Sequence, residues 1–167
     1  MTIQIDDGGY GDILFGVVIG AYRPEKDLFY YDLIDVKYWQ EPLFEKKVYK
    51  REARRIALKL LERMNPIDEV IEVCQGNILD QAAEAIIEEY PDKRIDRCMI
   101  EDRAQYLVEL AYINELRNLG YEPIKNRTSN WVKNFWDMYH WVEEKPDERL
   151  RWTKSGMPNL KRYKLFR

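Results

Sequence analysis

The sequence predicts an α/β protein with a mixed five-stranded sheet, in the element order βββαβαβα, and a C-terminal helical extension. Three observations support this: strand-like apolar stretches near the amino end, helical stripes of apolar residues at three- and four-residue spacings, and short apolar stretches between those stripes. Parallel strands need right-handed helical crossovers. We therefore expect the first three strands to be antiparallel and the last two to be added in parallel, with helices on both faces.

The first three strands are separated only by turns. An almost unbroken apolar run is typical of a central strand, and a stretch rich in aromatic and β-branched residues is typical of a strand with two distinct faces. In the third strand, alternation predicts Phe29 and Leu33 on one face, and Tyr30 and Ile34 on the other. The three strands are expected near residues 3–5, 13–21 and 28–38.

The remaining elements alternate between helix and strand. The helical stripes end at Asn65-Pro66, at Pro91 and at Gly120, which are common stop signals. If the fourth and fifth strands pair, Cys74 and Cys98 should lie on adjacent strands in the core. The expected ranges are 44–64 for a helix, 70–74 for a strand, 79–90 for a helix, 95–100 for a strand and 104–119 for a helix.

Length and composition suit one folded unit. The chain has 167 residues with a formal net charge of -3, and we expect a main domain at 1–121 with residues 122–167 packed on it. No apolar stretch approaches the ~20 residues needed to cross a bilayer, and acidic residues occupy the amino end where a secretory signal needs basic ones. The expectation is a cytoplasmic protein without membrane contact.

The sequence lacks the residues that several common kinds of site need. Two cysteines without CxxC spacing do not make a disulfide framework or a zinc site, and a single histidine, His140, leaves little for a Ser-His-Asp arrangement. The glycine-rich stretch 8–11 is not followed by GK[ST] and does not match GxGxxG, so neither a P-loop nor a dinucleotide fingerprint is present.

The stretch Ile5-Asp6-Asp7-Gly8, followed by the apolar run 13–19, resembles the start of the ribonuclease-H-like superfamily, which includes ribonuclease H, Holliday-junction resolvases and transposases. Together with the element order, the resemblance covers residues 1 to about 121. It implies a ribonuclease-H-like sheet with the first, fourth and fifth strands side by side. It also implies that Asp6 is a metal ligand.

The same resemblance implies further acids at the end of the fourth strand and near the start of the last helix. Glu101 and Asp102 fit the last position, whereas the fourth strand ends in Cys74-Gln75-Gly76-Asn77. Whether Gln75, Asn77 or Asp80 replaces the missing acid is open. The resemblance thus implies Asp6, Glu101 and Asp102 as catalytic residues, and Asp6, Asp7, Glu101 and Asp102 as ligands of Mg²⁺ or Mn²⁺, which prefer oxygen donors.

The carboxyl-terminal part is the basic part of the chain. Basic residues interleaved with aromatic ones are typical of segments that neutralise phosphates and stack on bases. A second basic set lies on the helix expected at 44–64, where a solvated face is the plainer interpretation. The nucleic-acid-binding candidates in the tail are Arg149, Arg151, Trp152, Lys154, Lys161 and Arg162.

Residues 128–144 predict another amphipathic helix, with Trp131, Phe135, Met138 and Val142 on one face. Two interpretations are open: this face packs on the rest of the chain, or it forms a homodimer contact. For the function, two hypotheses stand side by side. One is a divalent-metal-dependent nuclease or nucleic-acid-processing enzyme centred on Asp6. The other is a non-catalytic module of the same fold that binds nucleic acid or protein without a complete acidic cluster.

Overall fold

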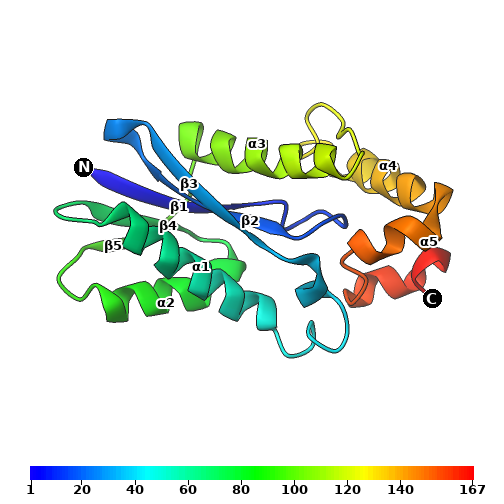
Figure 1. Ribbon diagram of the computed structural model, residues 1–167, viewed down its shortest axis with the longest axis horizontal. Coiled ribbons are helices and arrows are strands. Elements are labelled where there is room, and N and C mark those ends of the chain that lie inside the picture. The colour runs from blue at the N-terminus through cyan, green and yellow to red at the C-terminus, as the bar shows by residue number, and fades with distance from the viewer.

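The computed structural model describes residues 1–167 and has an α/β architecture. One five-stranded sheet lies between helices, with further helices and short 3-10 turns at one end of the molecule (Figure 1). The strands are β1 (Thr2–Gly8), β2 (Val17–Arg23), β3 (Leu28–Ile34), β4 (Val70–Cys74) and β5 (Ile95–Cys98). The helices are α1 (Val48–Met64), α2 (Asp80–Glu89), α3 (Asp102–Asn118), α4 (Trp131–Glu144) and α5 (Pro146–Arg149).

The sheet has the strand order β3-β2-β1-β4-β5. β1 pairs antiparallel with β2, and β2 with β3, whereas β1 pairs in parallel with β4, and β4 with β5. This confirms the mixed sheet with three antiparallel strands and two parallel additions. Cys74 and Cys98 are register partners on the paired strands β4 and β5, and both are half-buried.

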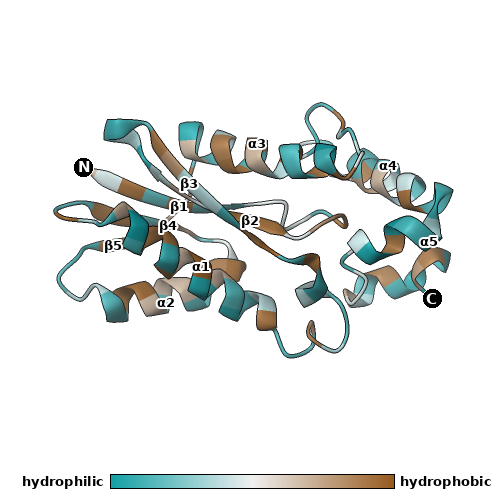
Figure 2. Cartoon of the chain, in the orientation of Figure 1, coloured by the Kyte–Doolittle hydropathy of each residue, from teal (hydrophilic) through white to brown (hydrophobic).

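Helices cover both faces of the sheet, with α3 on one face and α1 and α2 on the other (Figure 1). Ile3, Ile5, Ile71 and Val73 of the central strands are buried in one core together with the inner residues of α1 and α2. In Figure 2, hydrophobic and hydrophilic residues alternate along these helices, as amphipathic helices require. None of the helices has the length and apolar character needed to span a membrane.

Glycine lets α3 approach the sheet closely. A Cβ added to Gly8 would lie 2.7 Å from the carbonyl oxygen of Val108, and one added to Gly20 would lie 2.5 Å from the Val108 side chain. Both distances are shorter than van der Waals contact, so a larger residue at either position would push α3 away from β1 and β2.

A second core joins the carboxyl-terminal part to the rest of the chain. Met138 and Val142 of α4 are buried together with Tyr112 of α3 and with Leu14. Leu14 also forms an isolated bridge with Thr153. Residues 122–167 therefore pack on the part of the chain that carries the sheet, through one face of α4 and the turns that follow it.

β2 and β3 are each shorter than the sequence predicts. β2 begins at Val17 and not at Ile13, because Phe15 has a φ of 62° and breaks the strand. The apolar residues before it are buried by the second core and not by sheet neighbours. β3 ends at Ile34 because the Asp35 side chain accepts a hydrogen bond from the Lys37 backbone N–H at 2.9 Å and starts a 3-10 turn.

Other boundaries also shift. The first helix begins at Val48 and not near Phe44, since residues 41–47 form turns. β5 ends at Cys98, and Ile100 instead packs against Tyr22 in a small separate core. The faces of β3 are as predicted: Phe29 packs on the second core, and Ile34 is buried in the first.

Candidate metal centre

Three potential ligands converge where β1 and β4 approach their carboxyl ends. Ile5 of β1 pairs with Val73 of β4, so Asp6 and Cys74 follow side by side on parallel strands. Ligand atoms of Asp6, Asp7 and Cys74 lie within 4.8 Å of one another. Parallel strands direct their carboxyl ends to the same edge of a sheet, which is where open α/β sheets commonly place their sites.

The acidic cluster, which we define as Asp6, Asp7 and Cys74, is largely shielded from solvent and has little free space around it. Asp6 is 5% exposed, and Asp7 and Cys74 are half-buried. The Oδ1 atom of Asp7 lies 3.1 Å from the place that a Cβ of Gly76 would occupy. A side chain at Gly76 would therefore crowd Asp7, so glycine two residues after the end of β4 leaves room for the carboxylate.

The cluster disfavours its own negative charge. Burial raises the pKa of Asp6, against the opposing effect of a hydrogen bond from the Cys74 side chain. Burial and the charge of Asp6 raise the pKa of Asp7 to about 7, although Lys154 acts in the opposite direction. Burial raises the pKa of the Cys74 thiol to about 11, and the two carboxylates add to this shift. A bound cation would reverse each of these effects.

Lys154 holds the loop that follows the cluster. Its side chain is fully buried, and its Nζ donates hydrogen bonds to the carbonyl oxygens of Gly9 at 2.8 Å and Asp12 at 2.6 Å. Burial lowers the pKa of Lys154 to about 7. The prediction that Lys154 binds nucleic acid is therefore wrong, because its ammonium group faces backbone carbonyls inside the protein, out of reach of a phosphate.

Asp12 belongs to a different arrangement from the cluster. It is 8% exposed, and its carboxylate accepts hydrogen bonds from Arg127 at 2.5 Å and from the Asn134 amide at 2.9 Å. Arg127 also contacts Glu109. The carboxylate thus neutralises a buried arginine that comes from the segment before α4.

The structure does not bring Glu101 and Asp102 into the cluster. Both are exposed at the start of α3, and neither contributes a ligand atom to the group. Between β5 and α3 the chain crosses the sheet, and Ile100 is buried there beside Tyr22. Arg103, which follows Asp102, pairs with Asp27 in the turn between β2 and β3 at 3.5 Å. Their catalytic and metal-binding roles remain sequence predictions.

The candidates for the missing acid on β4 have other partners. The Gln75 amide donates to the carbonyl of Arg97 at 3.4 Å, and Asn77 accepts a hydrogen bond from the Tyr10 hydroxyl at 2.8 Å. Asp80 pairs with Arg97 at 3.1 Å. The residue beside Asp6 is Cys74, which the sequence suggested only as a buried thiol. Its position at the end of β4 was the signal that could have identified it.

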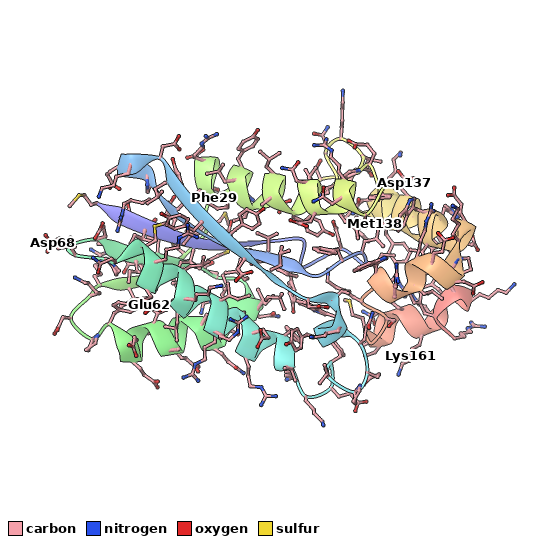
Figure 3. All side chains as sticks on the ribbon, in the orientation of Figure 1. Phe29, Glu62, Asp68, Asp137, Met138 and Lys161 are labelled. Carbon is pink, nitrogen blue, oxygen red and sulfur yellow. The ribbon has the colours of Figure 1, made fainter.

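The tail candidates for nucleic-acid binding other than Lys154 fall into two groups. Arg149 donates to the carbonyl of Trp141 and pairs with Glu144 at 3.0 Å, and Trp152 is half-buried near Phe15. In contrast, the side chains without a carboxylate within ion-pair distance are exposed, and Figure 3 shows Lys161 on the outer side of the carboxyl-terminal segment. This second group comprises Arg151, Lys161 and Arg162.

The basic face of α1 is partly used within the protein. Lys59 pairs with Asp32 at 2.7 Å, and Lys50 lies 3.8 Å from Asp80. Arg54, by contrast, is exposed and pairs with no carboxylate.

Comparisons of the chain with models of known protein families, with curated proteins and with solved structures find no match in any of the three.

Proposed function

We propose that this protein is a divalent-metal-dependent phosphodiester hydrolase of ribonuclease-H-like fold that acts on nucleic acid. The observation that carries the proposal is the convergence of Asp6, Asp7 and Cys74 at adjacent parallel strands. The strand order supports it, because β1, β4 and β5 lie side by side as the resemblance implies. The exposed basic residues of the carboxyl-terminal segment supply a surface suited to a polyanion.

The donor set fits a cation that accepts mainly oxygen ligands. Asp6 and Asp7 would hold it, and Cys74 lies close enough to complete the set or to remain a protonated neighbour that donates to Asp6. Two carboxylates favour Mg²⁺ or Mn²⁺, and a nearby thiol favours Mn²⁺ over Mg²⁺ because Mg²⁺ is the harder ion. When bound, such a cation polarises a phosphoryl oxygen and lowers the pKa of a water molecule.

The protein itself supplies position and shielding. Asp6 is held by the β1 backbone between β2 and β4, so its carboxylate has a fixed origin. Lys154 fixes the loop after the acids through two carbonyls, and Gly76 leaves space beside Asp7. These contacts set the separation of the two carboxylates before any substrate arrives, which limits the reorganisation needed during the reaction.

The first test is isothermal titration of Mn²⁺ into the native protein and into Asp6→Asn. We expect the variant to bind at least roughly tenfold more weakly, since it lacks a direct ligand. Asp68→Asn is the matched control, because Asp68 is an exposed aspartate outside the cluster and should leave the affinity unchanged. Cleavage of single- and double-stranded DNA and RNA should then depend on Mn²⁺ or Mg²⁺ and be lost in Asp6→Asn.

A second candidate function is favoured by one observation, namely that the cluster contains only two carboxylates. On that account the protein is a non-catalytic module that binds nucleic acid. It predicts binding that weakens steeply with salt and no cleavage with either metal. Equal Mn²⁺ affinity of the native protein and Asp6→Asn, or no Mn²⁺ binding to either, would replace the hydrolase with this module.

A further inference from the structure

A groove lies between α4 and the carboxyl-terminal turns, separate from the acidic cluster. Its volume is about 400 Å³, within the range of small-ligand sites. One end is formed by residues 11–13, which belong to the loop that starts at the cluster. We call it the α4 groove, and the residues on which its chemistry depends are Trp131, Phe135, Trp136, Leu160, Arg162 and Tyr163.

The walls of the α4 groove are aromatic and open to solvent. Trp131 is 71% exposed and Trp136 is 40% exposed, although both lie on a helix whose other face is fully packed. Figure 3 shows Met138 on the same helix, and its side chain is completely buried. Tyr163 closes the far side, with its ring centroid 5.5 Å from that of Trp136. Two exposed tryptophans around one cavity are unusual for a solvated surface and mark a contact site.

The edge of the α4 groove is positively charged. Arg162 is exposed, pairs with no carboxylate, and lies 5.0 Å from the centre of the Tyr163 ring. The nearby acids are already neutralised: Asp12 by Arg127, and Asp137 by Lys133 at 2.8 Å. The groove therefore combines flat apolar walls with an unpaired guanidinium at its edge.

Flat aromatic walls beside a free cation match one ligand chemistry best, a planar ring that carries an anion. An aliphatic peptide segment would leave Arg162 without a partner. A second copy of this chain, related by two-fold symmetry, would bring two positively charged edges together, which is unfavourable. Nucleotides meet both requirements, because bases stack on aromatic side chains and phosphates pair with arginine.

The geometry points to the α4 groove as a site that stacks a nucleobase of single-stranded nucleic acid, with the adjoining phosphate on Arg162. The choice of partner rests on the proposed function. The site deepens that function, because the loop from Gly9 to Asp12 connects the groove to the acidic cluster, and Lys154 holds both ends of this connection. A strand anchored in the groove would extend toward Asp6 and Asp7.

The test is a titration of short oligothymidylate, followed by intrinsic tryptophan fluorescence in the presence of a chelator. Stacking of thymine on Trp131 or Trp136 should quench the emission. Trp131→Ala and Trp136→Ala should each weaken binding by roughly tenfold. Tyr106→Ala is the matched control, since Tyr106 is 55% exposed on α3, outside the groove, and should bind as the native protein does.

The phosphate contact is tested with Arg162→Gln, which should weaken binding and reduce the slope of the logarithm of affinity against the logarithm of salt concentration by about 1. Arg54→Gln is its control, because Arg54 is an exposed arginine on α1 that also pairs with no carboxylate. Equal losses in Arg162→Gln and Arg54→Gln would mean diffuse electrostatic binding and would overturn the site.

Three other outcomes would also overturn it. The first is native affinity in both tryptophan variants, and the second is no oligonucleotide binding by the native protein. The third is a concentration-dependent dimer that Trp131→Ala abolishes, which would assign the groove to a second copy of the chain. Failure of the proposed hydrolase is distinguishable, because Asp6→Asn should lose Mn²⁺ binding and cleavage while it keeps oligothymidylate binding in the groove.

Discussion

The acidic pair Asp6 and Asp7 and the single acid Asp12 lie on one short stretch of chain but in opposite electrostatic situations. The carboxylate of Asp12 accepts hydrogen bonds from Arg127 and Asn134, so its charge is balanced inside the protein. Asp6 and Asp7 face each other and a thiol, and burial raises the pKa of each. Burial alone therefore does not distinguish the two situations, whereas a hydrogen-bonded cationic partner, which Asp12 has in Arg127, does.

Removal of the Asp12 carboxylate tests the contrast between the two kinds of acid most directly. Asp12→Ala leaves the buried Arg127 with Glu109 as its carboxylate partner and the Asn134 amide without its acceptor, and we expect a loss of about 1–3 kcal/mol in the free energy of unfolding. Chemical denaturation measures it. Asp80→Ala is the control: the Asp80 side chain is 48% exposed in its pair with Arg97, and its removal should cost less than about 1 kcal/mol. Similar losses in the two variants would show that Arg127 does not depend on Asp12.

Asp7 should behave in the opposite way. Its folded-state pKa is raised from 3.8 to about 7, so the folded state binds more protons than the unfolded state between those pH values, and stability falls as pH rises through that window. Asp7→Asn should therefore be more stable than the native protein above about pH 7, and gain nothing below about pH 3.8. Denaturation midpoints across this pH range measure the difference, and a difference independent of pH would contradict the shift.

Cys74 offers the smallest and most selective change. Cys74→Ser replaces a soft sulfur by a hard oxygen of similar shape, so the ratio of Mn²⁺ to Mg²⁺ affinity should fall by a few-fold, with little change in stability. Competition titration of the two metals measures this ratio. Cys98→Ser, on the neighbouring strand, is the matched control and should leave the ratio unchanged. A ratio unchanged in both variants would show that the thiol takes no part in metal binding.

The sequence predicted much of the sheet because local patterns specify it. The alternation in residues 28–34 placed Phe29 and Ile34 on opposite faces, and the structure confirms this. The start of β2 could not be predicted in the same way. Residues 13–16 are as apolar as a central strand, but Ile13 and Leu14 are buried in the second core by residues of α3, α4 and the tail, and α4 and the tail come more than a hundred residues later.

The candidate site was less predictable than the fold. Asp6 could be singled out by its place in the stretch Ile5-Asp6-Asp7-Gly8, whereas the closeness of Cys74 to Asp6 depends on the register between β1 and β4. Lys154 looked like one of several cations in a basic tail, and only tertiary packing shows that it is fully buried. Register and long-range burial are properties of the assembled chain, so composition and spacing do not reveal them.

The position of Lys154 has a consequence for the order in which the site is completed during synthesis. Proteins are made from the amino end, so Asp6 and Asp7 leave the ribosome early. The loop beside them is held by Nζ of a residue 145 positions after Gly9. Until that lysine has emerged and packed, the carbonyls of Gly9 and Asp12 lack their donor, and the acids lie next to an unsupported loop. A ribosome-bound nascent chain that ends before residue 154 would therefore carry both carboxylates in a site that is not yet assembled.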